Sequence, residues 1–265
     1  MSESLEVATA EGAISVRIDG EPGKPWLLMS NSLAADMSMW TQQLPAFGAR
    51  RRVVRYDTRG HGASSAPPGP YDFAGLVADV VAILDHLDIA QTDVIGLSLG
   101  GATALGLGLA RPERVRKLVC CCARAIYPAP ALQAWDQRIA QVAAGGVESV
   151  IEETLPRWFT PETLAARPEL AAQARRMMAT TSRAGYIGCV EALKSLAYFD
   201  KLPSLHVETL FVAGERDGGV PPQAMQETAA TVPGAKFGIV PGAAHIANME
   251  NASAFDALVL AFLAQ

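Results

Sequence analysis

The fold is decided by one stretch of the chain, Val94-Ile95-Gly96-Leu97-Ser98-Leu99-Gly100-Gly101. It fits the pattern Gly-x-Ser-x-Gly, with an apolar run before it and a helical stretch rich in Ala, Leu and Gly after it. A serine in this setting occupies a sharp strand–turn–helix corner, where a strained backbone projects the hydroxyl above the end of a sheet. The two outer glycines of the pattern allow the close chain approach that such a corner requires. We therefore predict that Ser98 is a nucleophile; the alternative is a Gly-rich helix start with an incidental serine.

A serine hydroxyl is a weak nucleophile and needs a general base, for which the chain offers four histidines. His245 lies in a small-residue loop between the last expected strand and the final helix, as the chain order serine, acid, histidine requires. His86 falls on the polar side of an amphipathic helix, and His206 precedes a strand. For His61, which lies in a turn, structural hydrogen bonding is the favoured interpretation. We predict that His245 is the base.

The orienting acid is expected in the loop Gly214-Glu215-Arg216-Asp217-Gly218-Gly219, which follows an apolar strand. Asp217 is our choice, and Glu215 is the competitor because it lies nearer to the strand. The carboxylate would hold the imidazole in one tautomer and stabilise the imidazolium.

Two backbone N–H groups are expected to bind the negative charge that develops on the attacked carbonyl oxygen. One belongs to Leu99, which follows the nucleophile, and the other to Leu33 in the loop after the strand 26–30. Asn31 and Ser32 precede Leu33 and are expected to line the substrate pocket. The alternative for this pair is an ordinary polar turn.

Short apolar runs alternate with longer amphipathic stretches over most of the chain. Continuous apolar strands separated by helices indicate an α/β fold with a mostly parallel sheet, covered by helices on both faces. We expect about eight strands. The strand candidates are residues 13–18, 26–30, 52–56, 92–96, 116–122, 207–213 and 237–240.

The region 125–200 breaks this alternation, because it is rich in helical patterns and contains no strand candidate. Its expected helices are 132–147, 150–159, 164–180 and 186–196. Helices inserted between two parallel strands are expected to cover the carboxyl edge of the sheet, where ligands of open α/β sheets bind. We therefore predict a core of residues 1–124 and 201–265, interrupted by a helical cap of residues 125–200.

Composition narrows the class of protein. Hydrophobic residues make up 50% of the 265 residues and charged residues 18%, a charged share below the roughly 25% of an average globular protein, which excludes a disordered chain. The net charge of −5 without a basic run argues against nucleic-acid binding. The first residues resemble no secretory signal, and no stretch is apolar enough for a membrane span, so we expect a cytoplasmic protein. Three of the four cysteines, Cys120, Cys121 and Cys122, are consecutive, which favours buried free thiols over disulfides or a metal site. No cofactor or metal is expected.

The chain resembles the α/β-hydrolases and, more closely, the bacterial 3-oxoadipate enol-lactonases over nearly its whole length. By this resemblance it has the α/β-hydrolase fold, with the cap inserted after the sixth core strand, and Ser98, Asp217 and His245 form the triad. The resemblance also implies that Trp135 and Trp158 lie in the cap near the pocket. It rests on Met29-Ser30-Asn31-Ser32-Leu33, Tyr56-Asp57-Thr58-Arg59-Gly60-His61-Gly62, Gly96-Leu97-Ser98-Leu99-Gly100-Gly101, Arg111-Pro112-Glu113-Arg114-Val115, Arg157-Trp158-Phe159-Thr160, Gly185-Tyr186-Ile187-Gly188-Cys189 and Pro241-Gly242-Ala243-Ala244-His245-Ile246-Ala247-Asn248.

The first functional hypothesis is therefore a serine esterase or lactonase, similar to the enol-lactonases, that acts on a small molecule as a monomer or small homo-oligomer. The enol-lactone carries a free carboxylate, which a cap arginine is expected to meet; the candidates are Arg124, Arg138 and Arg157. A second hypothesis keeps the triad but changes the bond, giving a C–C hydrolase, an amidase or a perhydrolase. A third is a non-catalytic ligand receptor of the same fold.

Overall fold

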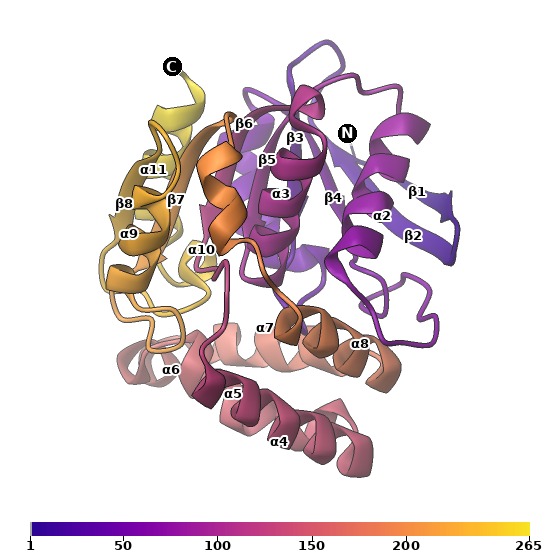
Figure 1. Cartoon of the computed structure of the whole chain (residues 1–265), viewed down its shortest axis with the longest axis vertical. Helices are drawn as coiled ribbons and strands as arrows, with labels where there is room; N and C mark the ends of the chain where they lie inside the picture. The colour runs from indigo at the N-terminus through magenta and orange to yellow at the C-terminus, as the bar shows by residue number, and fades with distance from the viewer. Residues whose placement is uncertain (1) are drawn as a thin grey trace.

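The computed structural model describes residues 2–265, which form a central sheet flanked by helices, with a further layer of helices at one end (Figure 1). The sheet has eight strands in the order β1-β2-β4-β3-β5-β6-β7-β8. The strands are β1 (Ser2–Thr9), β2 (Gly12–Asp19), β3 (Trp26–Ser30), β4 (Arg52–Tyr56), β5 (Thr92–Leu97), β6 (Val115–Cys121), β7 (Glu208–Gly214) and β8 (Lys236–Val240).

Most of the sheet is parallel. The β1–β2 and β2–β4 pairs are antiparallel, and all later pairs are parallel, so the predicted mostly parallel sheet of about eight strands is confirmed. The strand β1 escapes sequence-based prediction because Val7 is its only buried residue and charged Glu3 and Glu6 interrupt any apolar run. It is an edge strand, held by a hairpin to β2 rather than by a core of its own.

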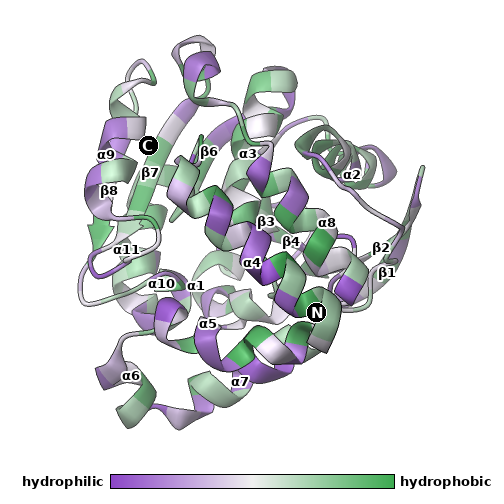
Figure 2. Ribbon diagram, turned by 60° about the horizontal axis from the view of Figure 1, so that its bottom comes forward, coloured by the Kyte–Doolittle hydropathy of each residue, from purple (hydrophilic) through white to green (hydrophobic). Residues whose placement is uncertain are grey.

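Both faces of the sheet are buried, which explains the continuous apolar strands. Leu27 packs in one core cluster with the C-terminal helix α11 (Ala252–Leu263), whereas Leu28 packs in the other with α2 (Phe73–His86) and α3 (Leu99–Ala110). Successive residues of a strand point to opposite faces, so a strand covered on both sides must be apolar throughout. Figure 2 shows hydrophobic residues along β7 and a mixture of hydrophobic and hydrophilic residues along α4, which is partly exposed.

The segment between β6 and β7 forms the layer of helices at the end of the sheet, which we call the helical layer (Figure 1). It contains α4 (Ala129–Gly145), α5 (Ile151–Trp158), α6 (Pro161–Ala166), α7 (Pro168–Ala179) and α8 (Arg183–Lys194). The prediction of one helix over 164–180 is wrong. Pro168 begins a new helix, because a proline disfavours the helical conformation of the preceding Arg167, whose φ and ψ are −132° and 64°.

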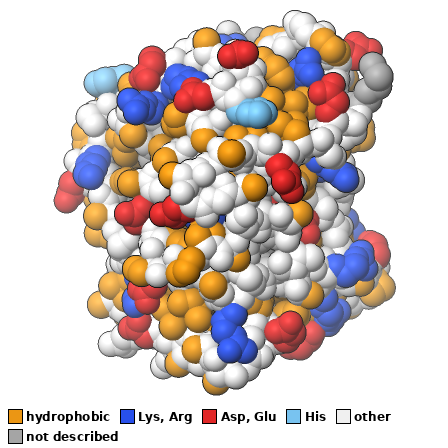
Figure 3. All heavy atoms as spheres, turned by 90° about the vertical axis from the view of Figure 1, so that its right-hand side faces the viewer, with side chains coloured by type: hydrophobic (Ala, Val, Ile, Leu, Met, Phe, Trp, Pro, Cys, Tyr) orange, Lys and Arg blue, Asp and Glu red, His pale blue; other side chains and the backbone are white. Residues whose placement is uncertain are grey.

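The remaining helical elements are short, and α9 is the longest of them. They are η1 (Met37–Gln43), α1 (Leu44–Gly48), η2 (Pro112–Arg114), η3 (Val147–Val150), η4 (Phe199–Ser204), α9 (Pro222–Ala230) and α10 (Ala247–Glu250). In the described part of the chain, no helix combines the length and apolar character that a membrane crossing requires. Acidic and basic side chains are interspersed on the face that Figure 3 shows.

The four cysteines are free and buried, as expected from their positions in apolar surroundings. Burial raises the pKa of the Cys120 and Cys189 thiols well above the usual value, so both stay protonated and unreactive near neutral pH.

Candidate active site

Ser98 sits at the corner between β5 and α3, as the Gly-x-Ser-x-Gly pattern predicts. Its φ of 57° and ψ of −113° lie in a region that L-residues rarely adopt. The flanking glycines are required by space: a Cβ on Gly96 would lie 2.0 Å from the Gly100 carbonyl oxygen. A Cβ on Gly100 would lie 2.2 Å from the Ser30 carbonyl oxygen. The corner therefore tolerates no side chain at either position, and Ser98 carries the backbone strain.

Asp217 and His245 meet across two loops at the same edge of the sheet. The Nδ1 atom of His245 lies 2.7 Å from Oδ2 of Asp217, whose carboxylate is buried. The second carboxylate oxygen accepts hydrogen bonds from the backbone N–H groups of Gly219 at 2.8 Å and Val220 at 3.0 Å. With Nδ1 donating to Asp217, Nε2 of His245 is left as the proton acceptor of the ring. The competitor Glu215 is exposed and accepts instead from the N–H of Gly242.

Ser98 and His245 line one small cavity of about 50 Å³ beneath the helical layer. Within the described residues, no hydrogen bond joins these two side chains, although the cavity brings them together. Hydrogen bonds of this kind are often long in proteins without a bound substrate and tighten in the complex. The other lining residues are Ser32, Leu33, Ala34, Trp135, Arg138, Thr154, Trp158 and Tyr186.

Two backbone N–H groups next to the cavity-lining residues Ser98 and Ser32 have no acceptor in the described part of the chain. Leu99 is the first residue of α3, where an N–H has no acceptor inside the helix. In the loop after β3, the N–H groups of Ser32, Ala34 and Ala35 each have an acceptor, whereas that of Leu33 has none among the described residues. Leu33 and Leu99 therefore each keep a backbone N–H free to donate, and the assignment of an oxyanion site to them stays a prediction.

His61 holds the loop that contains Leu33. The sequence predicts only that His61 makes a structural hydrogen bond within its own turn. His61 is fully buried; its Nε2 accepts from the Ala34 N–H at 2.9 Å and its Nδ1 lies 3.1 Å from the Arg59 carbonyl oxygen. Burial lowers the pKa of His61 to about 4, so the ring is neutral at neutral pH and able to accept. Ala34 has a φ of 62°, a left-handed conformation that this hydrogen bond helps to hold.

The predictions for Asn31 and Arg124 as pocket residues are corrected by the structure. The Asn31 amide is buried in the core, where it donates to the Tyr56 carbonyl at 2.6 Å and accepts from the Trp40 indole at 2.9 Å. It shapes the loop from behind and does not line the cavity. Arg124 does not line the cavity either, and its guanidinium donates to the Gly219 carbonyl oxygen at 3.0 Å.

Of the three predicted candidates, Arg138 is the arginine that lines the cavity. It is 7% exposed, and its Nη2 atom donates to the hydroxyl of Thr154 and, at 3.4 Å, to the carbonyl of Val150. In the described part of the chain no carboxylate pairs with it, and its Nε has no hydrogen-bond partner. Burial lowers the pKa of this guanidinium from its usual value, although it remains a cation. Arg157 is exposed.

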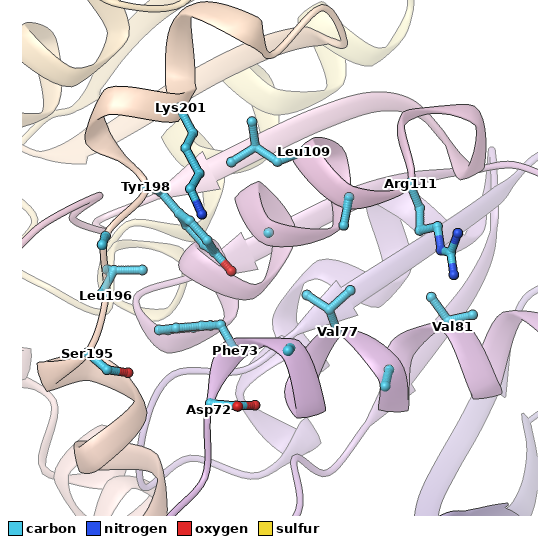
Figure 4. Close-up of a pocket in the computed structure, with 15 residues that line it drawn as sticks. Asp72, Phe73, Val77, Val81, Leu109, Arg111, Ser195, Leu196, Tyr198 and Lys201 are labelled. Atoms are coloured by element: carbon cyan, nitrogen blue, oxygen red, sulfur yellow. The ribbon is translucent and has the colours of Figure 1, made fainter.

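A larger hollow, of about 680 Å³, lies on the flank of the molecule between α2, α3 and the segment that precedes β7 (Figure 4). Phe73, Val77, Leu109 and Tyr198 contribute its apolar walls. It shares no lining residue with the Ser98 cavity. Between residues 2 and 265, no group of three His, Cys, Asp or Glu side chains has the arrangement of a metal site.

The family model described as the alpha/beta hydrolase fold matches residues 25–252. The chain belongs to the α/β-hydrolase family. This α/β-hydrolase is 37% identical to 3-oxoadipate enol-lactonase 2 of Acinetobacter baylyi over 205 residues, which are 77% of this chain and 76% of that protein.

Two solved structures are similar to this α/β-hydrolase over almost its whole length. The enol-lactonase from Burkholderia xenovorans has a TM-score of 0.95 and 34% identity, covering 98% of this chain and 100% of that one. A hydrolase from Pseudomonas aeruginosa has a TM-score of 0.95 and 35% identity, covering 99% of both chains. The predicted fold and the resemblance to enol-lactonases are therefore confirmed.

Proposed function

We propose that this protein is a serine hydrolase that cleaves a carboxylic ester or lactone, with Ser98, His245 and Asp217 as its catalytic triad. His245 Nε2 takes the proton of the Ser98 hydroxyl while the oxygen attacks the carbonyl carbon. Asp217 keeps the imidazole in the tautomer with hydrogen on Nδ1 and stabilises the imidazolium. The 2.7 Å contact between His245 and Asp217, at the edge of the sheet that also carries Ser98, supports these roles.

The tetrahedral intermediate places a negative charge on the former carbonyl oxygen. The N–H groups of Leu33 and Leu99 would donate to this oxygen, since neither N–H has a hydrogen-bond acceptor among the described residues. His245 then gives its proton to the leaving oxygen, and the acyl–serine ester forms. A water molecule, deprotonated by His245, attacks this ester and releases the acid product and the Ser98 hydroxyl.

We infer that the helical layer is the predicted cap and that it supplies the specificity. A buried Arg138 with no carboxylate partner is the single observation that selects an anionic substrate, because an unpaired buried charge is costly and a ligand carboxylate would complete it. A 3-oxoadipate enol-lactone carries such a carboxylate beside its lactone. The cavity of about 50 Å³ has room for only a few water molecules, so Trp135 or other cap side chains must move to admit a lactone.

The test is hydrolysis of 3-oxoadipate enol-lactone and of a neutral p-nitrophenyl ester by the purified protein and two variants. We expect Ser98→Ala to lower both rates by about 10³-fold or more. Ser204→Ala removes a serine from an exposed position and should keep both rates within twofold. A fluorophosphonate should label wild type and not Ser98→Ala.

Retention of ester turnover by Ser98→Ala would contradict the triad. A preference for an amide or a diketone over every lactone would replace the lactonase by an amidase or a C–C hydrolase on the same triad.

A further inference from the structure

A buried carboxylate, Glu250, lies outside the proposed triad and holds the loop of the proposed base. Glu250 ends the short helix α10 and is 6% exposed. Its Oε2 accepts from the backbone N–H of Ala244 at 2.6 Å. Its Oε1 accepts from both the backbone N–H and the hydroxyl of Thr160, each at 2.7 Å.

These contacts join two parts of the site that are far apart in the chain. Ala244 immediately precedes His245, and Thr160 is the N-cap of α6 in the helical layer, two residues after Trp158. On the other side of His245, the N–H of Ile246 donates to the Trp158 carbonyl oxygen at 3.1 Å. The backbone on both sides of His245 is thus hydrogen-bonded, directly or through Glu250, to the segment that carries a wall of the cavity.

We propose that Glu250 is a positioning residue that sets the orientation of His245 by tying its loop to the Trp158–Thr160 segment. The inference rests on the proposed function, because it assigns Glu250 a role through His245. The donors around the carboxylate are all neutral groups in the described part of the chain, so its purpose is not an ion pair.

Both carboxylate oxygens are needed for this role. An ionised carboxylate accepts on both oxygens, whereas a glutamine side chain accepts on one and donates from the other. Replacement by glutamine would leave either Ala244 or Thr160 with an N–H facing an NH₂ group. A displacement of the base by about 1 Å is enough to lower a rate about 10²-fold, since proton transfer depends steeply on geometry.

The experiment measures kcat and KM for a p-nitrophenyl ester with wild type, Glu250→Gln, Thr160→Val and Thr160→Ser. Thr160→Val removes the hydroxyl donor and Thr160→Ser restores it. The matched control is Glu162→Gln, the same chemical change on the exposed side of the same helix start, where Glu162 pairs with Arg216 at 2.9 Å. Thermal unfolding verifies that each variant is folded at the assay temperature.

We expect Glu250→Gln to lower kcat about 10- to 100-fold with KM within threefold of wild type. Thr160→Val should lower kcat about 3- to 10-fold, Thr160→Ser should return it to within twofold, and Glu162→Gln should stay within twofold. If Glu250→Gln does not fold, the Thr160 pair carries the test. Unchanged kcat in Glu250→Gln or Thr160→Val, or a loss confined to KM, overturns the inference. If Ser98→Ala is inactive while these variants are normal, only this inference fails; if Ser98→Ala is active, the proposed function fails with it.

Discussion

The imidazole of His61 accepts a hydrogen bond from the backbone N–H of Ala34 at 2.9 Å, so a fully buried ring holds the loop that presents the Leu33 amide. The accepting atom must be unprotonated, and burial satisfies this condition by lowering the pKa of His61 to about 4. The loop of the proposed oxyanion donor Leu33 and the neutral state of His61, 27 residues after Ala34, are therefore linked through one hydrogen bond.

This link predicts a pH-dependent contribution of His61 to stability. The unfolded chain binds a proton at His61 below pH 6.5, whereas the folded protein binds it only below about pH 4. Since the unfolded state holds more protons in this window, the contribution is present above pH 6.5 and is lost as the pH falls toward 4. We expect the difference in unfolding free energy between wild type and His61→Gln to shrink by about 3 kcal/mol from pH 7 to pH 4, measured by urea unfolding. A difference that is constant with pH would disprove the link.

The proposed role of Asp217 as the acid of the triad is tested by a pair of variants in one loop. Asp217→Asn keeps the shape but lets the side chain donate to His245 Nδ1, which stabilises the wrong tautomer, and kcat should fall by about 10³- to 10⁴-fold. Glu215→Gln should keep ester hydrolysis within threefold, because Glu215 is exposed and its carboxylate accepts a hydrogen bond from the backbone N–H of Gly242. A larger loss from Glu215→Gln than from Asp217→Asn would exchange the two assignments.

Much of this site follows from local sequence, because its parts lie at strand ends and their spacing is dictated by the fold. The Ser98 corner, the Asp217 loop and the His245 loop were all predictable from an apolar strand followed by small or polar residues. The role of Asn31 was not, because a polar side chain beside a pocket can point to either side, and only its buried partners Tyr56 and Trp40 decide.

The same limit applies to contacts between distant segments. Glu250 holds Thr160, 90 residues earlier in the chain, and no periodicity or motif records that pairing. The sequence cannot distinguish Arg124, Arg138 and Arg157, because only tertiary packing decides that Arg138 lines the cavity. The break between α6 and α7, by contrast, has a local signal in Pro168. The apolar pattern across 164–180 alone predicts one continuous helix and misses this break.

Substrate charge is tested by replacing Arg138 with methionine, which keeps an apolar stem and removes the guanidinium. A charge-assisted hydrogen bond contributes about 1.5 to 3 kcal/mol, so KM for the enol-lactone should rise about 10- to 100-fold. KM for the neutral ester should change by less than threefold. Arg157→Met is the control, since Arg157 is exposed, and this variant should leave KM for both substrates unchanged. An equal loss on both substrates would assign Arg138 to cap structure rather than to carboxylate binding.

The backbone strain at Ser98 predicts that glycine at this position gives a more stable protein than alanine. Ser98→Gly removes the Cβ at φ 57° and ψ −113° and should raise the unfolding free energy by about 1 kcal/mol relative to Ser98→Ala, after the greater flexibility of glycine in the unfolded chain is subtracted. Urea unfolding of the two inactive variants measures the difference. A Ser98→Gly variant that is less stable than Ser98→Ala by about 0.4 to 1 kcal/mol, the cost of glycine's flexibility alone, would mean that the corner stores no strain.

The loops that carry Asp217 and His245 approach closely at Gly214 but not at Gly218, four residues later. A Cβ on Gly214 would lie 2.0 Å from the Ala244 carbonyl oxygen, and backbone, unlike a flexible side chain, cannot give way cheaply. Gly214→Ala should therefore displace the residue before His245, lower kcat by about 10²-fold or more and lower the melting temperature. A Cβ on Gly218 would meet nothing within 4 Å, so Gly218→Ala should keep both within experimental error of wild type. A wild-type kcat in a folded Gly214→Ala variant would show that the His245 loop can move without loss of activity. The contacts that hold this loop would then have no geometric basis for a role in catalysis.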